Sequence, residues 1–408
     1  MTRSLLNLPV AAAVLAAAMP TFPVQADDRP ISALTAVVAA TREREFAPAI
    51  QPADIRPHIE FLASPELRGR GGRERTEAAR YIVTRFRELG LEPLFPDGRY
   101  AQDIPGKAEE NGVRPVIGRN VGALLPGSDP AVRDEVIIVS AHYDHLGSSG
   151  GEIYAGADDN ASGVAMVLEV ARQLAAAGQR PRRTIAFVGF DMEEQMLWGS
   201  RWFASHTPWP LEQVKLFITA DMIGRSLGNL PLPAVFVLGT EHAPQLKEAF
   251  DVVGRPAGLE VARLGTDLIG TRSDYGPFRD REVPYLFFST GEHPDYHTPR
   301  DTPDRIDYEK AARVSSLVLR IVQHVGETSQ PPVWSPAVNG DLDEVHALQR
   351  ITTLLMAAGD ERPLSDIQRY MITTVKNKTG RILEKGEMTP GDRTWLIRMA
   401  QLLLLSVF

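Results

Sequence analysis

The chain has 408 residues, 43% hydrophobic and 24% charged, which fits one large α/β domain with additions, or two domains. Its 44 basic and 52 acidic residues give a net charge of −8 without a long basic run, which argues against nucleic acid or an anionic membrane as the main partner. The absence of cysteine excludes disulfides, thiolate metal sites and a lipidated cysteine.

Residues 1–26 have the pattern of a secretory signal peptide. Arg3 precedes a short apolar stretch, and residues 24–26 (VQA) end it with the pattern that a signal peptidase recognises. Pro9 and Pro20 interrupt the stretch, so it is a poor permanent membrane span. We therefore expect an exported protein, periplasmic or secreted, with no stable membrane insertion after signal removal; a retained signal anchor is the alternative.

Hydrophobic periodicity predicts two helices between Asp54 and Leu91, separated by a glycine-rich and arginine-bearing loop at 64–72. That loop lacks a phosphate-binding lysine and a preceding strand, so we interpret it as packing near the rim of a site. Strands are predicted over 119–124, 135–141, 184–190, 214–220, 234–238 and 284–288. Further helices are predicted over 161–177, 198–206, 243–253 and 306–326. This alternation indicates a three-layer α/β/α fold with a mixed, mostly parallel sheet, whose ligands gather at the carboxyl ends of the strands.

A proline pair, Pro331 and Pro332, breaks the chain after Ser329. Residues 330–408 are predicted to form a small helical C-terminal extension of unknown role. Its last apolar run is too short to span a bilayer. We expect it to pack against the rest of the chain, with a dimer contact as the alternative, so the oligomeric state stays open.

The predicted strand 135–141 leads into a possible metal ligand. His142 and Asp144 lie two positions apart and can share one face, whereas His145 points elsewhere unless the strand has already ended. An imidazole beside an acidic group is typical of a metal ligand and the residue that orients it. The pattern is weak alone, because a histidine in a surface loop would look the same.

Residues able to bind a metal follow the other strands as well. They are Asp158 and Asp159 in the loop after 135–141, Asp191, Glu193 and Glu194 after 184–190, Asp221 after 214–220, and His297 beside Tyr296 after 284–288. Each has an ordinary alternative as a cap, a solvated helix start or a loop residue, but together they converge on one edge of the sheet. Imidazole and carboxylate ligands suit zinc, with cobalt or manganese as substitutes. A shared carboxylate would hold two ions about 3.5–4 Å apart, and one of the adjacent glutamates would stay free as a base.

Five stretches, SAHYDHLG, GADDNASG, FDMEEQMLWGS, ADMIG and DYHTPRDTPD, resemble in order the motifs of the secreted di-zinc aminopeptidases, the family of bacterial leucyl aminopeptidase and glutamate carboxypeptidase II. The resemblance covers roughly Ala53 to Val325. It implies that residues 27–329 form a di-zinc peptidase domain with the zinc-dependent exopeptidase fold. It also implies an exported metalloexopeptidase that hydrolyses N-terminal residues from peptides.

The same resemblance implies two Zn²⁺ per chain, with Co²⁺ or Mn²⁺ as possible substitutes, and assigns roles to individual residues. His142 and Asp221 would complete one zinc site, Glu194 and His297 the other, and Asp159, not Asp158, would bridge them. Glu193 would be the general base, Tyr296 an oxyanion donor and Asp144 the partner that orients His142. The peptide bond between Asp159 and Asn160 is expected to be cis.

Other functions on the same centre remain open. A carboxypeptidase or amidohydrolase would need a cationic clamp for a substrate carboxylate, and Arg225 or Arg272 could provide it. A non-catalytic binding protein and a single-zinc aminoacyl cyclase relative are less favoured, because the complete ligand set and Glu193 are present. The expected partner is a peptide or small amide, reached through an open site, since the span from Gln102 to Asp134 leaves no room for an inserted domain. The sequence predicts neither the preferred side chain nor the native metal.

Overall fold

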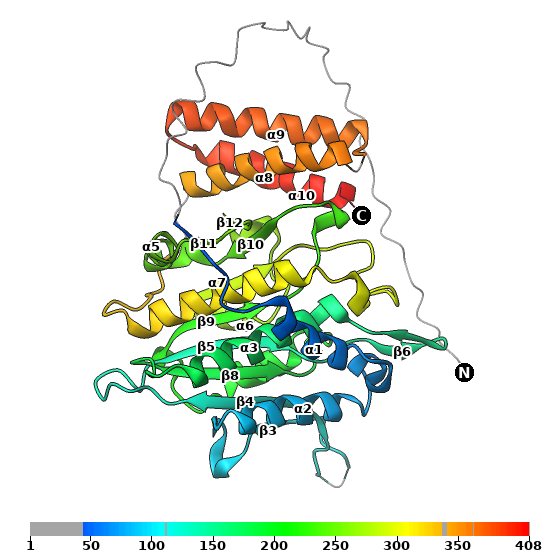
Figure 1. Cartoon of the computed structure of the whole chain (residues 1–408), viewed down its shortest axis with the longest axis vertical. Helices are drawn as coiled ribbons and strands as arrows, with labels where there is room; N and C mark the ends of the chain where they lie inside the picture. Colours follow the sequence, from blue (N-terminus) through cyan, green and yellow to red (C-terminus); the bar gives the residue numbers. More distant parts are fainter. Residues whose placement is uncertain (1–43, 111, 337–340, 362, 408) are drawn as a thin grey trace, which may run out of the picture. The chain divides into compact units, whose positions relative to one another are not determined.

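Apolar runs form the middle of a nine-stranded mixed sheet in the computed structural model, which describes residues 44–110, 112–336, 341–361 and 363–407 (Figure 1). The strands of this sheet are β2 (Glu92–Pro93), β3 (Ala101–Pro105), β4 (Val116–Leu125), β5 (Val136–His142), β8 (Thr184–Phe190), β9 (Val214–Ala220), β10 (Ala234–Leu238), β12 (Glu260–Leu264) and β13 (Tyr285–Ser289). Two short pairs lie outside it: β1 (Glu45–Phe46) with β11 (Arg255–Pro256), and β6 (Gly147–Ser149) with β7 (Glu152–Tyr154).

The four central strands run in the same direction. Their order is β13, β9, β5 and β8, and each pairs with its neighbour in parallel. On one side β10 pairs with β13 antiparallel, and on the other β4 pairs with β8 antiparallel. The carboxyl ends of four adjacent strands therefore meet at one edge of the sheet, where an α/β fold places its ligands.

Helices cover both faces of the sheet. They are α1 (Pro52–Leu62), α2 (Arg75–Glu88), α3 (Gly163–Ala176), α4 (Trp198–Ser205), α5 (Pro244–Val253), α6 (Gly276–Arg279) and α7 (Tyr308–Glu327), and the C-terminal extension adds α8 (Leu342–Glu361), α9 (Asp366–Lys385) and α10 (Pro390–Val407). Helices α1, α2, α3, α5 and α7 contribute to one core cluster, and α4 and α6 to a second. The predicted three-layer fold is confirmed.

Strand β5 shows why its apolar run is continuous. All seven of its residues are buried. Ile137 and Val139 belong to the core cluster on one face, whereas Val136 and Ile138 belong to the cluster on the other. Because side chains alternate along a strand, a strand covered on both faces carries apolar residues at successive positions, as 136–139 do here.

Most element bounds lie within a few residues of the predictions. The strand predicted over 135–141 ends one residue later, at His142. The short strands β3 and β12 and the β6–β7 hairpin were not predicted, because they are brief and carry mixed polarity.

The C-terminal helical extension is present and packs on the edge of the sheet that β12 forms. Ile351, Leu355 and Ile372 share a buried cluster with Leu230 and Ala262 of the sheet region. Arg350 on α8 also pairs with a glutamate of β12. The predicted boundary at 329/330 stays a prediction.

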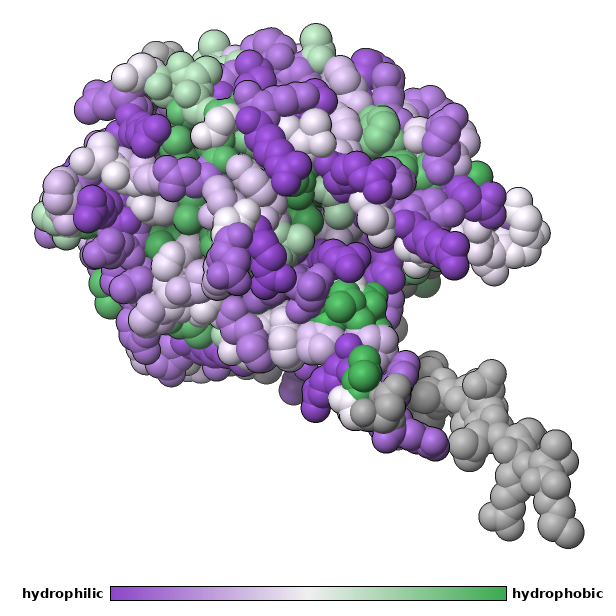
Figure 2. Space-filling view, turned by 90° about the horizontal axis from the view of Figure 1, so that it is seen from below, coloured by the Kyte–Doolittle hydropathy of each residue, from purple (hydrophilic) through white to green (hydrophobic). Residues whose placement is uncertain are grey.

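Within residues 44–110, 112–336, 341–361 and 363–407, no helix is both long and apolar enough to cross a bilayer. The face in Figure 2 is mostly hydrophilic, and its hydrophobic residues gather only in separate patches. The signal peptide predicted at 1–26 lies outside the described residues.

A buried carboxylate joins three helices on one face of the sheet. Glu169 of α3 accepts a 2.7 Å hydrogen bond from Nε of Arg172, and its other oxygen lies 3.1 Å from Nε2 of His58 on α1. Nδ1 of His58 in turn lies 2.7 Å from the hydroxyl of Tyr81 on α2. Burial favours the neutral acid, but the hydrogen bonds from His58 and Arg172 outweigh it and lower the pKa of Glu169.

We expect Glu169→Gln to lower the free energy of unfolding by about 1–3 kcal/mol at pH 7, because it removes the charge that these hydrogen bonds stabilise. Since the folded-state pKa is lowered, this contribution is complete above the ordinary carboxyl pKa and disappears as the pH falls through the lowered value. Denaturant unfolding of both proteins at pH 7 and at acidic pH measures it. The exposed Glu60→Gln serves as control, and a difference that stays constant with pH would contradict the assignment.

Candidate metal centre

The ends of four strands bring the predicted ligands together. His142 is the last residue of β5, and Asp221 directly follows β9. Glu193 and Glu194 follow β8, and His297 lies in the loop after β13. Since these strands are parallel neighbours, residues up to 155 positions apart in sequence (297 − 142 = 155) meet at one edge.

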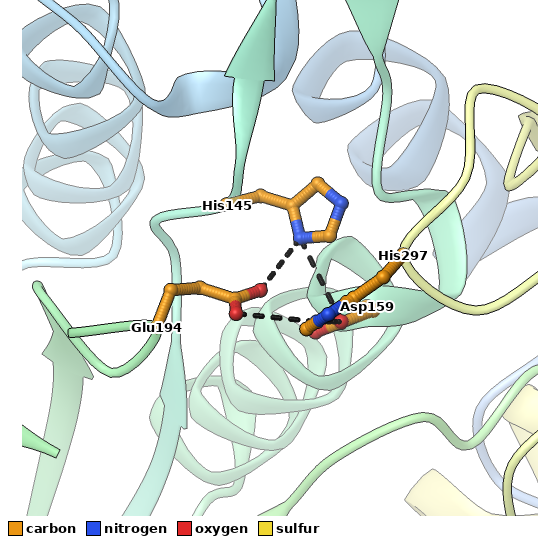
Figure 3. Close-up of side chains that lie close together, drawn as sticks. All are labelled: His145, Asp159, Glu194 and His297. Atoms are coloured by element: carbon orange, nitrogen blue, oxygen red, sulfur yellow. Dashed lines mark hydrogen bonds and ion pairs between the residues drawn. The ribbon is translucent and has the colours of Figure 1, made fainter. Parts of the chain in front are cut away.

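Two groups of side chains could each hold a metal ion. The first contains His142, Glu193 and Asp221, and the second contains His145, Asp159, Glu194 and His297. Figure 3 shows the second group, in which the two imidazoles and two carboxylates converge on one point. Every predicted metal ligand lies in one of these groups, and His145 joins them.

Asp159 lies between the two groups. Its Oδ1 is 3.3 Å from Nε2 of His142, whereas its Oδ2 is 3.1 Å from Nε2 of His297. The two oxygens of one carboxylate thus face a histidine of each group. Asp158 instead accepts a 2.6 Å hydrogen bond from the backbone N–H of Gly224 and lies outside both groups. The peptide bond after Asp159 is cis, as expected.

The backbone around Asp159 is held by another acid. The carboxylate of Asp301 accepts hydrogen bonds of 3.0 Å from the backbone N–H groups of both Asp158 and Asp159. Burial, and then the charge of Asp158, raises the pKa of Asp301 to about 6. Asp301 thus fixes the main chain that carries the carboxylate of Asp159.

Asp144 contacts both His142 and the adjacent glutamates. Nδ1 of His142 lies 3.2 Å from the backbone carbonyl of Asp144 but 3.7 Å from its carboxylate. The carboxylate accepts hydrogen bonds from the backbone N–H groups of Glu193, at 3.0 Å, and Glu194, at 3.4 Å. Asp144 therefore orients the adjacent glutamates with its side chain and contacts His142 mainly through its main chain.

The donor set fits a cation. Nε2 of His142 and Oδ1 of Asp221 lie 3.4 Å apart, are buried, and have no hydrogen-bond partner. Burial, with the nearby carboxyl groups of Asp274 and Asp221, raises the pKa of Glu193 well above its ordinary value despite the opposing charge of His142. Burial also raises the pKa of Asp274 to about 7, and both of its oxygens lack a partner. Such crowded, desolvated carboxylates are expected where positive charge is to be bound.

Tyr296 and His297 form the rim of the second group. Their rings stack with centroids 3.8 Å apart. Burial opposes a charge on His297, but the hydrogen bonds with Asp159 and Glu194 outweigh it and raise the pKa of His297 to about 10. Burial, and then the charge of Asp159, raises the pKa of Tyr296, so its hydroxyl stays protonated at neutral pH.

The two predicted substrate-binding arginines have partners. Nη2 of the buried Arg225 lies 2.9 Å from the carboxylate of Asp295 and donates to Asn229. Arg272 is exposed, and its Nη1 lies 3.3 Å from Glu292. Arg225 thus anchors a loop, and of the two only Arg272 has a side chain open to solvent.

Sequence reasoning missed the role of Arg70. Its fully buried guanidinium donates hydrogen bonds of 2.6–2.8 Å to the backbone carbonyls of Leu62, Tyr143, Ala155 and Gly156. Burial lowers the pKa of Arg70 to about 10, against the raising effect of the nearby carboxylates. The loop at 64–72 therefore holds the backbone of the site itself, as well as lying near it.

Comparison with known proteins supports this picture. The family model of peptidase family M28 matches residues 120–322. Leupeptin-inactivating enzyme 1 of Streptomyces exfoliatus is 31% identical over 171 residues, which are 41% of this chain and 34% of that protein. Aminopeptidase YwaD of Bacillus subtilis is 26% identical over 209 residues, 48% of this chain and 43% of that protein. The chain thus spans less than half the length of either relative.

One solved structure illustrates the shared fold. The crystal structure of BSAP, a zinc aminopeptidase from Bacillus subtilis, is similar with a TM-score of 0.53 at 16% identity. The likeness covers 72% of this chain and 100% of that one.

We expect Arg70→Lys to destabilise the protein by about 3 kcal/mol or more, because one ammonium group cannot replace a planar fork and leaves buried carbonyls without donors. The expected accompanying result is weaker metal retention, since the carbonyl of Asp159 also accepts from Arg70. Denaturant unfolding and metal analysis measure both effects. Arg68→Lys, on an exposed side chain of the same loop, is the control; equal stability of the two variants would contradict this role.

Proposed function

The chain belongs to the zinc metallopeptidases of peptidase family M28 through residues 120–322, and we propose that it is a di-zinc exopeptidase that removes N-terminal residues from peptides. The observation that carries the proposal is the pair of ligand groups that meet at Asp159, whose two oxygens face a histidine of each group. A single-metal site has no need of this arrangement.

The residues present would hold one ion with His142, Asp159 and Asp221, and the other with Asp159, Glu194 and His297. Zinc bound there supplies a Lewis acid for the substrate carbonyl and lowers the pKa of water to about 7. Glu193 remains outside these ligands as the general base. Its Oε2 lies 4.0 Å from Nε2 of His142, and the backbone contact with Asp144 fixes its position.

Two further groups serve the substrate. The protonated hydroxyl of Tyr296 would donate a hydrogen bond to the oxygen on which negative charge develops during attack. The carboxylates of Glu193 and Asp221 supply a negative field that favours a substrate carrying a free α-amine. These roles match an enzyme that acts at the amino end of a chain.

The geometry gives less support to a carboxypeptidase. That activity needs a cationic clamp for a substrate carboxylate, and Arg225 is already paired with Asp295. Arg272 is the remaining candidate, because solvent reaches both its side chain and that of its partner Glu292 and so weakens their ion pair. An amidohydrolase on the same centre is the other alternative, whereas a binding protein would have no use for Glu193. Export to the periplasm or medium is part of the proposal and rests on residues 1–26.

Metal analysis and a matched pair of substrates test the proposal. We expect two zinc ions per chain and hydrolysis of a dipeptide-like amide with a free amino end and a blocked carboxyl end. The substrate with the opposite blocking should not be cleaved, and chelation should abolish activity until zinc is restored. Cleavage of only the free-carboxylate substrate would replace the proposal with a carboxypeptidase that uses Arg272, and cleavage of neither would point to a non-peptide amide.

Glu193→Gln should retain both zinc ions and the stability of the parent protein while losing about 10²–10⁴-fold in kcat, because the amide cannot accept a proton. Steady-state kinetics and metal analysis on the same preparation measure this. Glu212→Gln, at an exposed position, is the matched control. Unchanged turnover, or a loss of zinc in Glu193→Gln, would reassign Glu193 to another role.

A further inference from the structure

His145 is a buried imidazole to which no function has been assigned so far. It lies three residues beyond His142, where β5 has already ended, so the alternation of a strand no longer turns it away from the site. Its side chain is fully buried, and its Nε2 has no hydrogen-bond partner. Its Nδ1 points toward Glu194 and Asp159 (Figure 3).

The local backbone is shaped to admit this ring. Gly156 has a φ of 62°, and a Cβ atom built on it would lie 2.5 Å from Cδ2 of His145. Any side chain at 156 would therefore displace the imidazole. The backbone N–H of His145 also donates to the carbonyl of Arg70 at 3.4 Å, which links it to the framework of the site.

The two imidazoles of the second group face the same two carboxylates. Nδ1 of His145 lies 2.8 Å from Oε1 of Glu194 and 3.6 Å from Oδ2 of Asp159. Nε2 of His297 lies 3.2 Å from Oε2 of Glu194 and 3.1 Å from Oδ2 of Asp159. Zinc–ligand bonds of about 2.0–2.1 Å at tetrahedral angles place ligand atoms about 3.3 Å apart. The four distances between the two imidazoles and the two carboxylates, from 2.8 to 3.6 Å, lie close to that spacing on both sides of it.

We propose that Nδ1 of His145 is a fourth protein ligand of the zinc ion held by Asp159, Glu194 and His297. The inference rests on the proposed di-zinc function and refines it. The site with His145 would then have four protein ligands, as closed structural zinc sites do, whereas the site with His142 would have three. The four-ligand site would retain its ion more tightly.

The competing interpretation is that His145 only donates a hydrogen bond to Glu194. His145→Asn separates the two, because the asparagine amide nitrogen falls near the position of Nδ1 and can donate to Glu194 but does not ligate zinc. X-ray absorption of the wild-type protein with two zinc ions should detect a total of three imidazole ligands for the two ions together. His145→Asn should count two, and a count of two in the wild type would overturn the proposal without any variant.

Stepwise chelation gives a second readout. One wild-type zinc ion should resist a chelator concentration that removes the other, and His145→Asn should lower the affinity of the resistant ion at least about tenfold. His346→Asn, on an exposed histidine of α8, is the matched control. Equal affinities of the two wild-type ions would overturn the proposal. If the protein binds two zinc ions but cleaves neither test substrate, the proposed function is wrong. The number of imidazole ligands can still be measured, so the two proposals are tested separately.

Discussion

The buried guanidinium of Arg70 is the interaction on which the site depends. Its three nitrogens donate hydrogen bonds to the backbone carbonyl of Tyr143, next to His142, and to those of Ala155 and Gly156, which precede Asp159 in the chain. A planar fork can satisfy several carbonyls at fixed angles, which an ammonium group cannot. With a pKa of about 10 it stays charged at neutral pH, so it also offsets part of the carboxylate charge around it. Arg70 therefore both fixes the positions of these backbone groups and balances part of the negative charge of the site.

Acidic residues outside the ligand set act in a complementary way. Asp144 accepts from the backbone N–H groups of Glu193 and Glu194, and Asp301 accepts from that of Asp159. In each case a carboxylate fixes the main chain of a residue whose own side chain belongs to one of the two candidate ligand groups. The ligands are thereby held by backbone contacts and need few side-chain contacts of their own, which leaves their lone pairs free for an ion.

Of the site residues that the sequence predicted, His142 and Asp221 are tied directly to strand ends, whereas the roles of Asp159 and His297, which do not directly follow a strand, followed from the family resemblance. Apolar runs locate β5, β8 and β9, and a residue that directly follows such a strand, like Asp221, is placed by the parallel sheet alone. His145 and Arg70 are reached only through the turns that follow or precede the regular elements. Their positions depend on individual backbone angles at glycines such as Gly156, which periodicity does not encode. The further contacts of Asp144 with Glu193 and Glu194 were missed for the same reason, because they are set where β5 has ended.

The C-terminal extension has a physical role even without a catalytic one. β12 is the outer strand of the sheet, and an uncovered outer strand offers unpaired backbone groups to other chains. Helix α8 packs beside β12, and its Glu344 accepts a 2.9 Å hydrogen bond from the backbone N–H of Gly265, just after the strand ends. Arg393 of α10 lies 3.2 Å from Glu344 and also pairs with Asp267. These contacts join the extension to the sheet through charged groups as well as apolar packing, so the extension covers the outer strand β12.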